Sequence, residues 1–279
     1  MTRTRILAAL LMAPTAIAAV LLLNTPWMAA VSAIVFLAAL WEWLRLAGIE
    51  DTLARTALLL LNLLLMVAIV WASATGGGSL VLLKMLAMIG VVWWLAATLW
   101  LRRYTFAAAH DARARIVKLS AGTLAVIPAW AALCVIHANE DGAFGNRWLL
   151  LALAIVWATD TGAYFAGRRF GKRKLAPRIS PNKTVEGLIG GVIAGVVVAV
   201  AFAPLAGATA GQLPLVALVA LLTVLASVVG DLFESLLKRH AGAKDSGTLI
   251  PGHGGVLDRI DSVLAALPVF AFGQIWFGF

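Results

Sequence analysis

The chain has 279 residues, of which 62% are hydrophobic and only 13% are charged. A soluble domain of this length needs far more polar residues to cover its surface, so the composition indicates a protein embedded in lipid. A formal net charge of +9 would suggest nucleic-acid binding in a soluble protein. Here basic loops on the cytoplasmic side of a membrane account for the charge, and we expect no nucleic-acid partner.

Apolar runs long enough to cross a bilayer recur along the whole chain. We predict about nine transmembrane helices, over residues 6–23, 27–44, 57–73, 80–101, 119–137, 148–166, 185–205, 213–236 and 262–278. The first run follows Arg3 and Arg5 and resembles a secretory signal, but the many later spans favour a retained first helix. The predicted fold class is therefore all-α, a polytopic integral membrane protein.

The runs are not separated by a low-complexity linker, so we predict one membrane domain over residues 1–279. Residues 1–150 form an N-terminal multi-span region, and residues 151–279 form the catalytic helices and loops. Lys and Arg predict the orientation, because cytoplasmic loops are enriched in them. With a cytoplasmic N-terminus, the cytoplasmic segments hold 20 of the 22 basic residues. The C-terminus is then external.

The acidic residues fall into two groups. Six lie near span ends or in loops, and we expect them to be solvated: Glu42, Glu50, Asp51, Asp111, Glu140 and Asp141. The other seven lie at the cytoplasmic ends of the last four spans: Asp160, Glu186, Asp231, Glu234, Asp245, Asp258 and Asp261. Since a carboxylate at the centre of a membrane helix costs on the order of 3 kcal/mol, function or pairing must compensate there.

The spacing of these acids places them on two helix faces. Asp231, Glu234 and Lys238 share one face of a helix, together with Ser235, and Asp258 and Asp261 begin the last span in the same pattern. Two helix ends that each offer carboxylates form a site for Mg²⁺, which prefers one or two carboxylates plus phosphate oxygens and water. The alternative is a set of interhelical salt bridges made by Lys238 and Arg259.

The loop between these helices carries groups suited to phosphate. Its cations are Lys238, Arg239, Lys244 and Arg259, and arginine offers forked donors to phosphate oxygens. Gly252, Gly254 and Gly255 allow the backbone to approach a ligand closely. His253 is placed to donate to a phosphate oxygen or a leaving group, although a lone loop histidine is as often structural.

A second polar loop, "ISPNKTVEG", follows the sixth span. Ser180 predicts an N-cap and Pro181 the first helical position. Lys183 and Thr184 would then lie at a helix N-terminus, which favours anions. The basic residues just upstream, in "FGKRKL", are equally consistent with contact to lipid headgroups.

Two segments resemble a known family. "SLLKRHAGAKDSGTLIPGHGGVLDRID", residues 235–261, resembles the signature of phosphatidate cytidylyltransferases, also called CDP-diacylglycerol synthases. "ATDTGAYFAGRRFGKRKLAPRISPNKTVEGLIGG", residues 158–191, is similar to the second characteristic block of that family. Residues 1–150 match only as a hydrophobic multi-span region.

The resemblance implies transfer of CMP from CTP to phosphatidate, with Mg²⁺ required and a second cation possible. It also implies a homodimer in contact with membrane lipid, in a bacterial-type inner (cytoplasmic) membrane with its site facing the cytoplasm. The implied metal ligands are Asp231, Asp258 and Asp261, and the catalytic set adds Lys238, Arg259 and His253. The implied substrate-binding residues are Ser180, Asn182, Lys183, Thr184, Glu186, Ser235, Arg239, Lys244, Asp245, Gly254 and Gly255.

Two other functions fit parts of the pattern. An ion or proton transporter also places carboxylates and glycines in membrane helices, but it does not explain a basic, glycine-rich loop beside the acids. A polyprenol kinase, or a cytidylyltransferase for another lipid phosphate, uses similar chemistry.

Overall fold

The computed structural model describes residues 2–76, 78–139, 144–249 and 254–279. This part of the chain contains nine long helices: α1 (Thr2–Leu22), α2 (Thr25–Leu46), α3 (Thr52–Thr75), α4 (Val81–Leu101), α5 (Ala112–Ala138), α6 (Gly145–Phe170), α7 (Val185–Phe202), α8 (Leu213–His240) and α9 (Leu257–Phe277). A short antiparallel hairpin, β1 (Lys174–Ala176) and β2 (Ser180–Thr184), joins α6 to α7. Two 3-10 turns, η1 (Ala203–Ala206) and η2 (Ala210–Gln212), lead into α8.

Each of the nine predicted apolar runs coincides with one helix, which confirms an all-α, multi-pass membrane protein. In the described residues, eight of the helices are long and apolar enough to cross a membrane, and α1 contributes a shorter apolar stretch, Met12–Leu22. A count of nine spans and a cytoplasmic N-terminus therefore stay predictions. Several helices extend beyond their apolar runs, because backbone hydrogen bonding continues where the side chains become polar.

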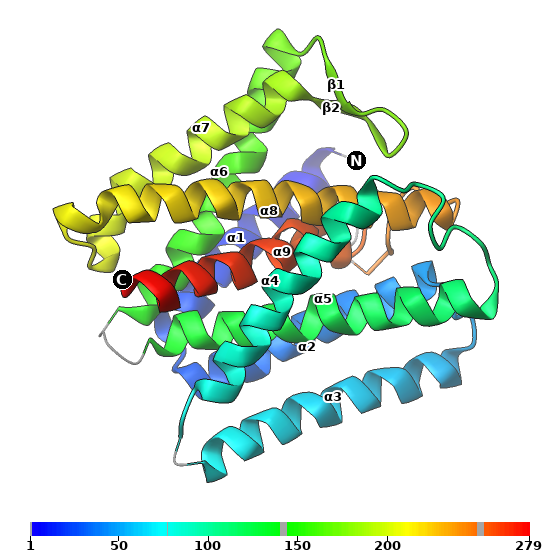
Figure 1. Ribbon diagram of the computed structural model, residues 1–279, viewed down its shortest axis with the longest axis horizontal. Coiled ribbons are helices and arrows are strands. Elements are labelled where there is room, and N and C mark those ends of the chain that lie inside the picture. Colours follow the sequence, from blue (N-terminus) through cyan, green and yellow to red (C-terminus); the bar gives the residue numbers. More distant parts are fainter. Residues whose placement is uncertain (1, 77, 140–143, 250–253) are drawn as a thin grey trace.

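The core of the bundle forms around α5, which packs against α2, α4, α6 and α9 (Figure 1). Residues on every face of the C-terminal half of α5 are buried, as expected for a helix that is hydrophobic all round. Gly90 of α4 sits where α4, α5 and α9 meet. A Cβ atom there would come within 2.7 Å of Pro128 and 2.9 Å of Pro268, so the three helices approach too closely for a larger residue.

Helices α6 and α7 form an antiparallel pair at the edge of the bundle, with the hairpin at their joined end (Figure 1). Small residues allow their backbones to approach closely. A Cβ atom on Gly190 would overlap the side chain of Ala166, and one on Gly162 would come within 2.5 Å of Ala194. This tight pairing fixes the hairpin relative to both helices.

The predicted apolar run 185–205 begins where α7 begins, but the prediction of Ser180 as its N-cap and Pro181 as its first residue is wrong. Residues 180–184 form strand β2, and α7 begins at Val185 with Thr184 as its N-cap, whose Oγ1 accepts a hydrogen bond from the Gly187 N–H at 3.1 Å. Ser180 instead pairs with Ala176 across the hairpin. Pro181 is tolerated because both strands of a two-stranded sheet are edge strands, where a missing N–H donor leaves no ladder bond unmade.

Candidate active site

A cavity of about 530 Å³ lies between α6, the hairpin, α7, α8 and the start of α9. Its polar lining combines residues of the hairpin segment with polar residues of the helices: Thr159, Asp160, Tyr164, Arg168, Ser180, Asn182, Lys183, Thr184, Asp231 and Ser262. The described residues of the glycine-rich loop do not line it. Apolar side chains, including Leu188 and Val228, complete the wall. Residues distant in the sequence therefore meet in one pocket that offers both charged and apolar surface.

Asp231 of α8 and Lys183 of β2 form an ion pair in this cavity, and each side chain is a little over one-quarter exposed. On the other side of Asp231, the Ser235 hydroxyl donates to Oδ1 at 3.5 Å, one helical turn along α8. The spacing of Asp231 and Ser235 thus places them together as predicted. The hairpin supplies the cation that the spacing on α8 alone does not indicate.

Lys238 joins α8 to α9. Its Nζ lies 2.6 Å from Glu234 Oε2 on its own helix and 2.7 Å from Asp258 Oδ1 on α9. The other oxygen of Asp258, Oδ2, accepts hydrogen bonds from the Ser246 N–H at 3.0 Å and the Gly255 N–H at 2.8 Å. The Asp258 carboxylate is therefore held from both sides, and Lys238 makes the interhelical salt bridge that the structural alternative predicts.

The carboxylates around Lys183 and Lys238 are close enough to interact electrostatically. Asp261 lies within such range of Asp231, Asp160 and Glu234. Together with Asp258 this makes five acids, and two lysines form ion pairs with members of the group. A partly buried surplus of negative charge is costly unless a cation or protons neutralise it.

The donor set is compatible with a hard divalent cation, but not as the predicted three-carboxylate site. Among the residues that the structure describes, no three His, Cys, Asp or Glu side chains lie close enough to hold one metal. Magnesium in phosphate-transfer sites needs only one or two carboxylates, with phosphate oxygens and water completing its shell. Asp231 faces the cavity and can provide such a carboxylate. Asp258 does not line the cavity, and its two oxygens accept hydrogen bonds from Lys238, Ser246 and Gly255.

Two of the predicted substrate-binding residues, Arg239 and Glu186, make structural contacts outside the cavity. Arg239 Nε donates to the Ile179 carbonyl at 3.1 Å, which ties α8 to the hairpin. The Glu186 carboxylate accepts from the Lys172 and Arg173 N–H groups at 2.9 and 3.1 Å, which fixes the start of the hairpin segment. Neither Arg239 nor Glu186 lines the cavity.

The glycine-rich loop is described only from Gly254 onward, and His253 lies outside the described residues. Gly254 has a φ of +83°, a left-handed conformation that favours glycine. Lys244, Asp245 and Arg259 are exposed, so the structure leaves their predicted roles toward substrate open.

Glu42 was predicted to be solvated, and this is wrong. Its side chain is 2% exposed at the end of α2, and Oε2 accepts hydrogen bonds from Ser246 Oγ at 3.0 Å and the Leu257 N–H at 2.8 Å. Arg45, one turn further along α2, donates to the Ser246 carbonyl at 2.5 Å. The one local indication of this role is that Glu42 lies between two tryptophans in an apolar run.

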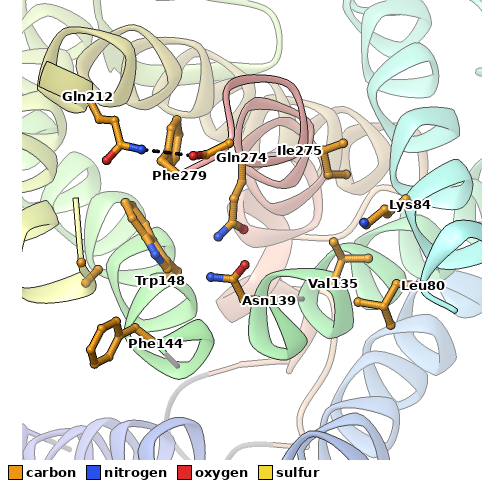
Figure 2. A pocket seen from close by; sticks show the side chains of 13 residues that line it. Leu80, Lys84, Val135, Asn139, Phe144, Trp148, Gln212, Gln274, Ile275 and Phe279 are labelled. Atoms are coloured by element: carbon orange, nitrogen blue, oxygen red, sulfur yellow. Dashed lines mark hydrogen bonds between the residues drawn. The ribbon is translucent and has the colours of Figure 1, made fainter. Parts of the chain in front are cut away.

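A second cavity, of about 460 Å³, lies at the other end of the bundle, where Asn139 and Gln274 face each other and Gln212 donates to the Gly278 carbonyl at 3.1 Å (Figure 2). Gln212 lines the second cavity just before α8 and Asp231 lines the first one further along α8, so the two cavities are separated by about 28 Å along that helix. None of the described residues that line the second cavity is acidic. The carboxylate–lysine cavity is therefore the candidate active site.

The fold and this cavity define a multi-pass membrane protein with a carboxylate–lysine site suited to phosphate groups. The chain belongs to the cytidylyltransferase family, whose model matches residues 3–276. This membership sets aside the transporter hypothesis.

Curated relatives carry a more specific name. The chain is 41% identical over 272 residues to a phosphatidate cytidylyltransferase of Pseudomonas aeruginosa, which covers 97% of this chain and 96% of that protein. It is 47% identical over 139 residues to the phosphatidate cytidylyltransferase of Haemophilus influenzae, covering 49% of this chain and 48% of the relative. The Bacillus subtilis enzyme of the same name is 46% identical over 133 residues, 46% of this chain and 48% of that protein.

Proposed function

We propose that this protein is a phosphatidate cytidylyltransferase, which converts CTP and phosphatidate to CDP-diacylglycerol and pyrophosphate. The observation that carries the proposal is the 41% identity to a protein of that name over nearly the full length of both chains. The cavity supports it, because Lys183, Arg168 and the carboxylates of Asp160 and Asp231 lie beside apolar surface in a bundle of membrane-spanning helices.

In this reaction a phosphate oxygen of phosphatidate attacks the α-phosphorus of CTP. A new P–O bond forms, the bond from the α-phosphorus to the bridging oxygen breaks, and pyrophosphate leaves with that electron pair. The attacking oxygen is already anionic, so no general base is required. The main barrier is repulsion between two anions, and positioned cations lower it.

Two lysines of this chain can supply such cations, Lys183 from the hairpin and Lys238 from α8. Lys183 reaches the cavity from the hairpin, next to Thr184, the N-cap of α7, and the N-terminus of that helix adds a partial positive charge. Lys238 is held between Glu234 and Asp258, which orients its ammonium group. We infer that these two lysines neutralise substrate phosphates, and that the substrate displaces or shares their present carboxylate partners.

We further propose that Mg²⁺ is required and that Asp231 and Asp258 hold it, with Asp261 beside them. When bound, the ion would polarise phosphoryl oxygens and neutralise the leaving group. The surplus of carboxylates over paired lysines supports this assignment. A site on the cytoplasmic face of the inner membrane is proposed from the distribution of Lys and Arg. A homodimer is proposed from family resemblance alone.

The test is incorporation of label from α-labelled CTP into lipid by purified protein with detergent-dispersed phosphatidate. Label recovered in CDP-diacylglycerol, with one pyrophosphate released per lipid formed, is the expected result. Parallel assays with a polyprenyl phosphate and other lipid phosphates distinguish the remaining alternatives. Transfer to one of these and not to phosphatidate would replace the proposed acceptor.

A further inference from the structure

Glu42 connects the N-terminal half of the protein to the candidate active site. Its carboxylate is buried at the end of α2, and both hydrogen bonds to it come from residues more than 200 positions later in the chain, Ser246 and Leu257. Glu42 does not line the cavity, and the proposed reaction assigns it no step. The contacts themselves indicate what it does.

Helix α9 begins without a cap of its own. Its N-cap residue, Val256, makes no side-chain capping hydrogen bond, although the first backbone N–H groups of any helix need partners. Glu42 supplies one by accepting from the Leu257 N–H, and Ser246 supplies the next by accepting from the Asp258 N–H at 3.2 Å. A carboxylate at this end of a helix is also favoured by the helix dipole.

Ser246 transmits this contact to Asp258. It is fully buried; its Oγ donates to Glu42, its N–H donates to Asp258 Oδ2, and its carbonyl accepts from Arg45. A Cβ atom on Gly247 or Gly255 would overlap the Glu42 carboxylate, so both glycines pack directly against it. Glu42 thereby fixes both the backbone and the side chain of Asp258.

We infer that Glu42 is a positioning residue for CMP transfer. It fixes the first turn of α9 and so holds the Asp258 carboxylate where it contacts Lys238. This inference rests on the proposed function, in which Asp258 acts at the phosphate-transfer centre. It also gives the N-terminal multi-span region a role in the reaction beyond membrane embedding.

The test compares Glu42→Ala and Glu42→Gln with a matched control, Ser32→Ala. Ser32 is a buried polar residue of the same helix whose Oγ donates to the Ala29 carbonyl, far from the loop. For each purified variant, kcat per folded protein, KM for CTP and for phosphatidate, and Tm are measured in one detergent. Glu42→Ala should lower kcat by about 100-fold, because small misplacements of reacting groups cost that much.

Glu42→Gln should retain most of the activity, since its amide oxygen can still accept from both Ser246 and Leu257. Both KM values should stay within about threefold of wild type, because positioning affects the transfer step rather than ground-state binding. Ser32→Ala should match wild-type kcat. A merely structural role for Glu42 would lower Tm and the yield of folded protein while leaving kcat per folded protein unchanged, and that result would overturn the inference.

Glu42→Ala can fail to fold, so Ser246→Ala is the second variant. It removes the hydroxyl contacts to Glu42 and to the Asp258 N–H, and it keeps the Leu257 N–H bond to Glu42 and the Ser246 N–H bond to Asp258 Oδ2. Its kcat should fall by about 10-fold or more, and a kcat equal to that of wild type would also overturn the inference. A wild-type protein that transfers no CMP refutes the proposed function instead. The two failures are therefore distinguishable.

Discussion

Lys238 and Asp258 bridge the two helices that carry most of the predicted catalytic residues, with Nζ 2.7 Å from Oδ1. The same ammonium group contacts Glu234, which is almost fully buried. Lys238 is thus a structural ion-pair partner, and the proposed function gives it a second role toward the substrate phosphates. From the sequence these two roles are alternatives; the structure shows the ion pairs, and the phosphate role stays a prediction.

This double role changes the expected effect of Lys238→Met. Removing the cation leaves Glu234 and Asp258 as adjacent carboxylates with little solvent, so unfolding should become easier by on the order of 3 kcal/mol. CMP transfer should also fall by at least about 100-fold, because a phosphate-neutralising group is lost. Transfer assays and thermal melting in the same detergent measure both effects. Wild-type turnover in a destabilised protein would leave Lys238 with a structural role only.

Lys183→Met tests the second cation with a smaller structural cost. Its ion pair with Asp231 is partly exposed, so loss of the pair should cost less than about 1 kcal/mol of stability. CMP transfer should nevertheless fall by about 10-fold or more, because Lys183 lines the cavity. The informative comparison is with Lys172→Met, an exposed lysine before the hairpin that does not line the cavity. Equal losses in the two variants would argue against a phosphate contact by Lys183.

The proposed metal site predicts that chelation abolishes transfer and that added Mg²⁺ restores it. Asp231→Asn should raise the Mg²⁺ concentration needed for half-maximal activity and lower the maximal rate, because one of two proposed ligands loses its charge. Asp258→Asn should have the same effect and also lower Tm, since it weakens the bond to Lys238. Titration of Mg²⁺ against initial rate measures this. A wild-type Mg²⁺ response in Asp231→Asn would remove that residue from the metal site.

The helices could be predicted from the sequence because each is encoded by its own apolar run. The acids of each helix could also be grouped by helical spacing, which places Asp231 and Glu234 together on α8 and Asp258 and Asp261 together on α9. Glu42 could not be assigned, because its partners Ser246 and Leu257 are brought to it only by the packing of α2 beside α9.

The conformation of the hairpin could not be predicted from its local sequence. Ser180 and Pro181 have the local chemistry of a helix start, yet pairing with residues 174–176 prevails and the segment is extended. The basic residue that this strand brings to Asp231, Lys183, was nevertheless assigned to the site, because its position near the start of α7 was approximately right. Local rules thus predicted the neighbourhood of the residue and not its conformation.

Gly255→Ala should impair transfer through packing alone. The added methyl group would overlap the Glu42 carboxylate and Ser246 Oγ, so the loop or the first turn of α9 must shift. The matched control is Gly211→Ala, where a Cβ atom meets nothing within 4 Å. We expect a loss of kcat of about 10-fold or more for Gly255→Ala and none for Gly211→Ala. Equal activity of the two variants would show that the loop tolerates displacement.

The last prediction concerns topology, and it rests on the 20 of 22 basic residues that a cytoplasmic N-terminus places inside. Nine spans then put Phe279 outside and residues 167–183 inside. The single cysteine, Cys134, is buried and is replaced by Ala, and single cysteines are placed at positions 172 and 276, which are both exposed. In intact cells, a membrane-impermeant thiol reagent should label position 276 and not position 172. Labelling of position 172 alone would reverse the orientation, and equal labelling of both positions would indicate an even number of spans between them.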